Sequence, residues 1–297
     1  MAETSDSIVH TATGSHGAGA LYVVATPIGN LDDISARAVA TLKMVDLIAA
    51  EDTRHSARLL AHLGVRAPLL SLHDHNERAR AEQLGERIAR GERVALISDA
   101  GTPLISDPGY RLVNWLRERG LAVIPLPGAC ALITALSAAG LPTDRFRFEG
   151  FLPAKRGARR AALEALRRER ATLAFYESPH RIEETLEDLA EAFGERRVVL
   201  ARELTKRFET FLDGDALGLL ARMREDPDQA RGEFVVMVEG AAEQTGESGE
   251  VDGEALLAAL AESGVGVKQA AAVAARLLGG RKQEWYARAQ SLKEGER

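Results

Sequence analysis

Two carboxylates, a hydroxyl and a guanidinium stand together at Glu51-Asp52-Thr53-Arg54, directly after the apolar run 45–50. A carboxylate at the end of a buried strand could act as a general base, and an arginine beside it could stabilise developing negative charge. The same residues could instead serve as the N-cap and first-turn acids of the helix that follows. The sequence leaves both interpretations open for Glu51, Asp52 and Arg54.

A second polar cluster, His73-Asp74-His75-Asn76-Glu77, follows another short apolar run. Alternate residues of an extended segment point to the same side, so the two histidines could face one metal ion. The sequence indicates no third ligand nearby, and we therefore expect no metal site. A polar loop that faces the substrate, with His75 as a candidate base, or a helix N-terminus capped by Asn76, fits the cluster better.

A loop rich in glycine, proline and aspartate occupies residues 98–109, with the sequence Ser-Asp-Ala-Gly-Thr-Pro-Leu-Ile-Ser-Asp-Pro-Gly. It follows residues 93–97, an apolar run that predicts a buried strand. Glycine lets a ligand approach the backbone closely, and ligands of open α/β sheets bind outside the carboxyl ends of the strands. We therefore expect this loop to hold a small-molecule cofactor.

A basic segment begins near residue 155, where seven basic residues meet two glutamates before residue 171. Such an excess could form a surface that contacts the phosphates of a nucleic acid. It could equally be the solvated face of a helix. The basic residues are Lys155, Arg156, Arg159, Arg160, Arg167, Arg168 and Arg170.

The elements that must position these clusters alternate along the first half of the chain. Apolar runs at 21–25, 45–50, 93–97 and 121–126 are each followed by a turn and an amphipathic stretch, which predicts a mostly parallel sheet covered by helices. The runs of the second half are more closely spaced and favour a mixed sheet with antiparallel pairs. Near the end, three alanine-rich amphipathic stretches predict short helices that could form a helix-turn-helix-like module.

These patterns predict an α/β protein in several parts. We expect a disordered tail (1–20), an N-terminal α/β domain with the cofactor loop (21–126), a second α/β domain (127–240), a linker (241–253) and a C-terminal helical module (254–297).

Composition narrows the class of protein. The net charge of −6 argues against a uniformly basic nucleic-acid coat. The single cysteine, Cys130, permits no disulfide within one chain; it fits a reducing cytoplasm and is interpreted as a small buried apolar residue. The sequence shows neither a signal peptide nor a run long enough to cross a membrane, and the phosphate-loop and zinc-hydrolase motifs are absent.

Many segments together resemble one family, the ribosomal RNA small-subunit methyltransferases I, which are 16S rRNA (cytidine-2′-O)-methyltransferases of the tetrapyrrole methylase superfamily. The resemblance covers about residues 20 to 297, with Ala129 and Pro179 as departures at turn positions. It rests on Thr26-Pro27-Ile28-Gly29-Asn30-Leu31, Ala50-Glu51-Asp52-Thr53-Arg54, the 73–77 cluster, the 98–109 loop, Leu126-Pro127-Gly128, Gly150-Phe151-Leu152-Pro153, Phe175-Tyr176-Glu177-Ser178, His180-Arg181 and Ala201-Arg202-Glu203-Leu204-Thr205-Lys206.

The resemblance implies S-adenosylmethionine as methyl donor, bound in a cleft between two α/β domains of tetrapyrrole methylase type. It also implies a homodimer and, as acceptor, the ribose 2′-hydroxyl of a cytidine in the decoding centre of 16S rRNA, within the small ribosomal subunit. Carried over by position, the cofactor contacts are Pro27, Ile28, Asp99, Gly101, Thr102, Leu104, Ala131, Leu132, Tyr176 and Val238.

Methyl transfer to a hydroxyl needs orientation of donor and acceptor and help in removing the proton or stabilising the charge. The sequence does not single out one base among Glu51, Asp52, His75 and Glu177. Arg54 and Lys206 are candidates to stabilise the developing charge. The candidate RNA contacts are Arg159, Arg160, Arg181 and Arg202.

Two other functions stay open at this point. One is methylation of a tetrapyrrole or corrin precursor, the other main activity of the superfamily; the basic segment and the helical module favour RNA instead. The second is a non-catalytic ribosome-assembly factor, against which the charged clusters at several strand ends argue.

Overall fold

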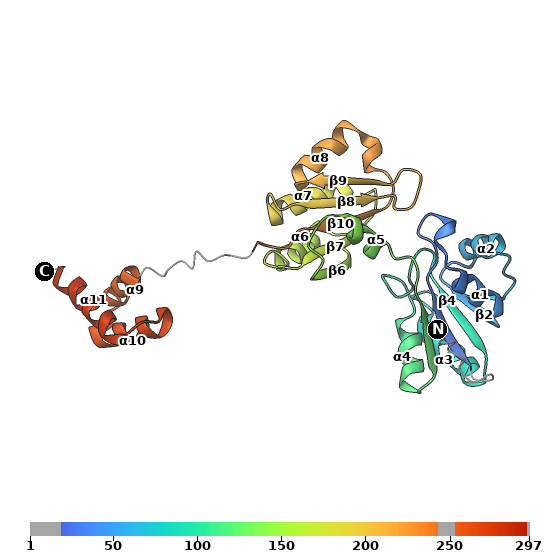
Figure 1. Ribbon diagram of the computed structural model, residues 1–297, viewed down its shortest axis with the longest axis horizontal. Coiled ribbons are helices and arrows are strands. Elements are labelled where there is room, and N and C mark those ends of the chain that lie inside the picture. The colour runs from blue at the N-terminus through green and yellow to red at the C-terminus, as the bar shows by residue number, and fades with distance from the viewer. Residues whose placement is uncertain (1–18, 243–252, 296–297) are drawn as a thin grey trace, which may run out of the picture. The chain divides into compact units, whose positions relative to one another are not determined.

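The computed structural model describes residues 19–242 and 253–295, with side chains to residue 292. The chain divides into two compact units, with the boundary along the sequence between Ala241 and Ala242. The first unit holds two α/β domains, and the described part of the second unit is helical (Figure 1). The tail predicted over 1–20 and the linker predicted over 241–253 lie almost entirely outside the described residues.

The strands within residues 19–126 form one parallel sheet, as the alternation of apolar runs predicts. The order across the sheet is β3-β2-β4-β1-β5, so the carboxyl ends of all these strands lie at one edge. That edge carries both the 98–109 loop and the 51–54 cluster. The strands are β1 (Ala20–Val24), β2 (Leu47–Ala50), β3 (Leu69–Ser71), β4 (Arg93–Ile97) and β5 (Ala122–Leu126).

Helices cover both faces of this sheet. Buried side chains such as Ile48 and Leu60 form one apolar layer, and Leu84 and Leu112 belong to the layer on the opposite face. Burial of such side chains is the main term that stabilises the domain. The helices are α1 (Ala36–Met44) and α2 (Thr53–His62) on the first face, α3 (Glu77–Ala89) and α4 (Tyr110–Glu118) on the other, and the short 3-10 helix η1 (Leu31–Asp33).

The second domain is built on a mixed sheet, as the closer spacing of its apolar runs predicts. The order is β6-β7-β10-β8-β9; β6 and β7 are parallel, and the other neighbours are antiparallel. The strands are β6 (Phe146–Phe151), β7 (Thr172–Glu177), β8 (Val198–Arg202), β9 (Thr210–Gly214) and β10 (Phe234–Val238).

Side chains of this second sheet alternate between two apolar layers. Ala174 faces α5, whereas its neighbour Phe175 packs in the layer of α6, α7 and α8. α5 thus packs on the second sheet. The helices are α5 (Ala131–Ala138), α6 (Arg156–Ala165), α7 (Ile182–Phe193), α8 (Ala216–Glu225) and the 3-10 helix η2 (Pro227–Ala230).

Two of these elements, β9 and α8, were not predicted from the sequence. β9 is a short edge strand that pairs only with β8. α8 carries a glycine in its first turn, which weakens the helical pattern, although Asp215 caps it by accepting a hydrogen bond from the Gly218 amide at 2.6 Å.

The second unit is described as the three helices predicted, α9 (Gly253–Glu262), α10 (Val267–Leu278) and α11 (Lys282–Gly295). They enclose a small core around Leu257, Ala270, Ala274 and Ala289. In the described part of the chain, no helix is both long and apolar enough to cross a membrane.

A buried ion pair joins α6 to α7. Arg159 is fully buried, and its Nε donates to Asp188 Oδ2 at 2.7 Å while Nη2 donates to Glu184 Oε2 at 3.0 Å. Asp188 also accepts from Arg156 Nε at 3.0 Å. The structure therefore corrects the expectation that Arg159 contacts RNA, because its guanidinium offers no surface to a partner.

Replacing Asp188 with alanine is expected to lower the free energy of unfolding by about 3–5 kcal/mol, because it leaves a buried guanidinium poorly compensated. Arg160→Ala is the control: Arg160 lies on the same helix, and its ion pair with Glu191 is about half exposed, so a loss below about 1 kcal/mol is expected. Urea unfolding followed by circular dichroism measures both. Equal losses in the two variants would contradict the structural role of Asp188.

Candidate functional site

Hydrogen bonds tie together the turns that follow β1, β4 and β5. Thr26 and Gly101 exchange backbone hydrogen bonds of 2.9 and 3.0 Å. The Thr26 hydroxyl donates to the Ser98 carbonyl at 3.0 Å, and the Thr102 hydroxyl donates to the Ala129 carbonyl at 2.8 Å. The 98–109 loop is therefore held against both neighbouring strand ends.

The same loop contains two non-glycine residues in the left-handed region, Leu104 at φ 73° and Ser106 at φ 66°. Such conformations are costly and are concentrated at binding and catalytic sites. Glu77 fixes the end of the loop, because its Oε1 accepts hydrogen bonds from the amides of Gly109 at 3.0 Å and Arg111 at 2.7 Å. One member of the 73–77 cluster is thus a buried support for α4.

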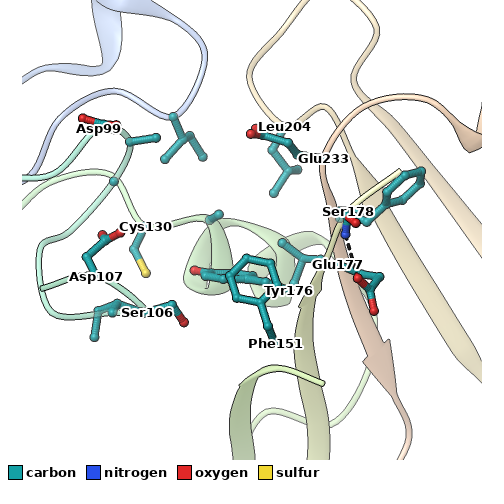
Figure 2. Close-up of a pocket in the computed structure, with 18 of the residues that line it drawn as sticks. Asp99, Ser106, Asp107, Cys130, Phe151, Tyr176, Glu177, Ser178, Leu204 and Glu233 are labelled. Carbon is teal, nitrogen blue, oxygen red and sulfur yellow. Dashed lines mark hydrogen bonds between the residues drawn. The ribbon is translucent and has the colours of Figure 1, made fainter. Parts of the chain in front are cut away.

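A pocket of about 400 Å³ lies between the two α/β domains, beside this loop. Its size is in the range of small-molecule sites. Figure 2 shows Asp99, Asp107 and Cys130 on one side and Phe151 and Tyr176 across from them. The N-terminal domain contributes Ile28, Asp99, Gly101, Thr102, Ser106 and Asp107, and the second domain contributes Ala131, Phe151, Tyr176, Leu204, Lys206 and Val235.

The pocket wall formed by the N-terminal domain is negatively charged, because it carries the carboxylates of Asp99 and Asp107. Burial and repulsion from Glu51 raise the pKa of Asp107 to about 6, and a hydrogen bond to Ser98 partly offsets this. Burial raises the pKa of Glu51 too, with repulsion from Asp99 and Asp74 acting in the same direction. A cationic ligand would relieve this repulsion, so the wall favours a molecule with positive charge.

A cation lies on the opposite wall. Lys206 Nζ is 2.8 Å from both Glu203 Oε1 and Glu233 Oε2. Burial alone would lower the pKa of Lys206, but the two hydrogen bonds outweigh it and raise that pKa above its ordinary value. Lys206 is therefore protonated at neutral pH and acts as a fixed positive charge rather than as a base.

The loop that carries Lys206 also touches the N-terminal domain. Thr205 Oγ1 accepts a hydrogen bond from the Asn30 amide at 3.1 Å. Gly29 is the required residue beside it, because a Cβ there would lie 2.4 Å from Lys206 Cγ and 2.9 Å from the Leu204 carbonyl oxygen. This close approach joins the two domains at the pocket.

Tyr176 anchors the start of α5. Its hydroxyl accepts a hydrogen bond from the Leu132 amide at 3.2 Å, and burial raises its pKa, so the phenol stays neutral. Cys130 is partly buried and packs against the apolar layer around α5, but it also lines the pocket, so the prediction of a small buried apolar residue is confirmed only in part.

The structure brings together most of the residues expected to contact the cofactor. Pro27, Leu104 and Leu132 each adjoin or closely neighbour a lining residue in the chain, while Val238 does not. The expected contacts that line the pocket are Ile28, Asp99, Gly101, Thr102, Ala131 and Tyr176.

The predicted cofactor contact at Val238 is wrong, because Val238 lies away from the pocket. It is fully buried in the layer that packs on α6 to α8. Because β10 runs antiparallel to β7, its first residues, Phe234 and Val235, meet the carboxyl end of β7 and line the pocket. Val238 stands about 10 Å further along the strand than Val235.

The candidate bases are placed unequally. Glu177 lines the pocket, and its Oε1 accepts a hydrogen bond from the Ser178 amide (Figure 2). Its Oε2 accepts from Arg181 and Thr185, so both carboxylate oxygens already have partners. Asp52 is the N-cap of α2, and hydrogen bonds from the Arg54 and His55 amides lower its pKa. The helix-capping interpretation of Asp52 is therefore confirmed.

The other candidates from the first domain do not line the pocket. Arg54 is almost fully exposed, and His75 is exposed beside His73, with ring centroids 6.0 Å apart. Glu51 does not line the pocket, but its charge acts on two residues that do, Asp99 and Asp107. Of the catalytic candidates, Glu177 and Lys206 are pocket residues.

Two further arginines were expected to bind RNA. Arg202 is buried, and its guanidinium donates to the carbonyls of Asp228, Arg231 and Phe208, so it supports the β8–β9 turn instead. Arg181 is partly buried and donates to the Leu152 carbonyl at 2.7 Å.

Apart from Cys130, six polar or aromatic pocket residues were not among the predicted contacts: Ser106, Asp107, Phe151, Ser178, Glu233 and Phe234. Asp107 stands in the same loop as Asp99, so its position in that loop was an available signal. Phe151 lies in the Gly-Phe-Leu-Pro segment that carries part of the resemblance. Glu233 precedes an apolar run and gave no signal, because only the antiparallel direction of β10 brings it to the pocket.

Two family models match the chain. Residues 20–217 match the Tetrapyrrole (Corrin/Porphyrin) Methylases, and residues 247–293 match the RsmI C-terminal HTH domain. The first match spans both α/β domains through β9, and the second covers α9, α10 and most of α11.

Individual proteins resemble it as well. A ribosomal RNA small subunit methyltransferase I of Pseudomonas aeruginosa is 54% identical over 274 residues, which are 92% of this chain and 97% of that protein. One of Escherichia coli O157:H7 is 53% identical over 90% of this chain and 93% of its own length. Among solved structures, the methyltransferase CobJ aligns with a TM-score of 0.56 at 24% identity, over 76% of this chain and 95% of its own, which shows the shared fold.

Proposed function

The chain belongs to the ribosomal RNA small subunit methyltransferase I family of the tetrapyrrole methylases, and we propose that it transfers a methyl group from S-adenosylmethionine to the ribose 2′-oxygen of a cytidine in 16S rRNA. The observation that carries the proposal is the pocket at the carboxyl ends of β1, β4 and β5, with Asp99 and Asp107 on one wall and Lys206, paired with Glu203 and Glu233, on the other.

The pocket residues fit such a donor. S-adenosylmethionine carries a sulfonium and an ammonium group, and Asp99 and Asp107 offer the negative charge that both groups favour. Ile28, Ala201 and Val235 form a buried apolar surface suited to an adenine ring. The donor supplies an activated methyl group, and displacement of its sulfur by an oxygen completes the transfer.

The chain's own residues orient the reactants and manage charge. The tied loops of the first domain hold one wall in place, and Tyr176 fixes the start of α5. Orientation of this kind can contribute roughly 7–11 kcal/mol to lowering the barrier. Lys206, as a permanent cation, stabilises the negative charge that builds on the 2′-oxygen, and the proton of the hydroxyl passes to solvent water.

We extend the proposal to the biological setting. The substrate is the small ribosomal subunit, the acceptor cytidine lies in the decoding centre, and the enzyme acts in the cytoplasm as a homodimer. The names of the relatives support an rRNA acceptor. Of the four arginines expected to contact RNA, two remain as candidates for a phosphate contact. They are Arg160, which is about half exposed on α6, and Arg181.

Donor affinity is expected to rise about 10-fold between pH 5 and pH 7.5. The pKa of Asp107 is about 6, so only about a tenth of its carboxyl is ionised at pH 5, and a cation binds the ionised form. Calorimetry with S-adenosylmethionine at several pH values measures this, and Asp107→Asn should flatten the profile.

The same variant is expected to stabilise the free protein at pH 7.5. A folded-state pKa above the unfolded value means that proton binding favours folding at low pH, and this contribution is lost as the pH rises from about 4 through 6. With allowance for partial exposure, a gain of about 1 kcal/mol is expected. In the unchanged protein, a donor affinity that does not vary with pH would contradict the assignment of Asp107 to the donor site.

The experiment that tests the function is transfer of tritiated methyl groups from S-adenosylmethionine to three acceptors. Small ribosomal subunits that lack the modification should be labelled, whereas a tetrapyrrole precursor should not. Naked 16S rRNA tests whether the assembled subunit is needed. Labelling of the tetrapyrrole alone would support a tetrapyrrole methyltransferase instead. Labelling of no acceptor would support a non-catalytic ribosome-assembly factor.

A further inference from the structure

A bulge in β6 aims an aromatic side chain into the pocket. Phe148 pairs with Ala174 and Phe151 pairs with Tyr176, so three steps along β6 match two along β7. The extra residue turns Phe151 to the face that Phe148 occupies, because side chains otherwise alternate along a strand. Gly150 permits the bulge with a φ of 66°.

The bulge produces a row of three aromatic rings. Tyr176 lies between the other two, with ring centroids 4.8 Å from Phe148 and 5.7 Å from Phe151, both edge to face. Phe151 forms the outer end of the row and lines the pocket (Figure 2). An edge-to-face contact with Tyr176 covers at most one face of the Phe151 ring, which leaves the other face to meet a ligand.

Phe151 is 56% exposed, although it is a large apolar residue beside a pocket. Packing of the domain does not require this, since the unbulged strand would place the ring on the opposite face. The donor's adenine has a more enclosed surface at Ala201 and Val235, which are almost fully buried. The exposed ring therefore lies where a ligand enters from solvent.

We propose that Phe151 is the stacking platform for the cytosine base of the target nucleotide. The inference rests on the proposed function, because it presupposes an RNA acceptor at this pocket. An enzyme that acts on a ribose within folded RNA must draw the nucleotide out of its stack, and an aromatic ring replaces the lost stacking energy. Phe151 acts as a positioning residue, since it holds the base while the 2′-oxygen reacts elsewhere in the pocket.

The test compares Phe151→Ala, Phe151→Leu and Phe151→Tyr in methyl transfer to small ribosomal subunits. Loss of one stacked base lowers binding by on the order of 10-fold to 100-fold, so Phe151→Ala should raise the KM for subunits to that extent. Phe151→Leu should behave similarly, because it keeps apolar volume but has no aromatic face. Phe151→Tyr should retain activity within about twofold of the unchanged protein.

Phe146→Ala is the matched control. Phe146 is 42% exposed on the same strand and does not line the pocket, so its loss should leave the KM unchanged. Calorimetry should give the same S-adenosylmethionine affinity for all four variants and the unchanged protein.

Each other outcome overturns the inference. Full activity of Phe151→Ala or Phe151→Leu would show that no stacking occurs there. Loss of S-adenosylmethionine binding in Phe151→Ala would assign the ring to the donor. Failure of the unchanged protein to label subunits would instead overturn the proposed function and this inference with it.

Discussion

Asp99→Ala is expected to reduce S-adenosylmethionine affinity about 10-fold to 150-fold. The change removes a carboxylate from the wall that faces the cationic donor, where a hydrogen bond to a charged group contributes roughly 1.5–3 kcal/mol. It also removes the acceptor of the Asp52 amide, which donates to Asp99 Oδ1 at 3.1 Å and links β4 to the start of α2. Calorimetric titration measures the loss.

Asp99→Asn separates charge from structure, because the amide oxygen can still accept the hydrogen bond from Asp52. We expect it to keep the melting temperature of the unchanged protein and still lose donor affinity roughly 10-fold or more. Asp52→Asn, at the cap of α2 and outside the pocket, is the matched control and should bind normally. Unchanged affinity in both Asp99 variants would remove Asp99 from the donor site.

Lys206→Met is expected to lower kcat about 100-fold while donor affinity changes little. Removal of one group that stabilises an oxyanion typically costs 10²–10³ in rate. Methionine keeps the length and apolar contacts of the stem, including the contact with Gly29, and removes the charge. Steady-state methyl transfer to small subunits measures kcat, and single-turnover transfer measures the chemical step apart from binding and product release.

Two companion variants show whether charge or architecture is responsible. Lys206→Arg should recover part of the rate, because it restores a cation. Glu233→Gln leaves Lys206 held by Glu203 at 2.8 Å, so it should keep most of the activity. A Lys206→Met enzyme as fast as the unchanged protein would contradict the role of this cation, and a pH profile that follows the titration of Lys206 would identify it as a base instead.

Local patterns in the sequence predict most of the fold. The alternation of apolar runs with turns in the first half predicts the parallel sheet, and the 98–109 loop is found where such sheets bind ligands. α9, α10 and α11 confirm the three short helices predicted near the end of the chain. β9 and α8 were missed, because a short edge strand and a helix that contains glycine give weak periodicity.

Roles that depend on long-range packing could not be predicted. Arg159 and Arg202 stand among basic or polar neighbours in the sequence, yet both are buried by segments distant in the chain. Arg159 pairs with Asp188 on α7, and Arg202 donates to the carbonyls of Asp228 and Arg231. Charge alone does not distinguish a surface arginine from one that joins two elements. Strand direction is equally hidden, which is why Val235 and Glu233 replace Val238 at the pocket.

The most direct test of the central claim is to identify the methylated atom in labelled 16S rRNA. Digestion to nucleosides followed by mass spectrometry should find the tritium in 2′-O-methylcytidine. Alkaline hydrolysis should leave an uncleaved dinucleotide at that site, because a methylated 2′-oxygen cannot attack the neighbouring phosphate. Label found on a base, or label that alkali releases in ordinary mononucleotides, would contradict methyl transfer to a ribose 2′-oxygen.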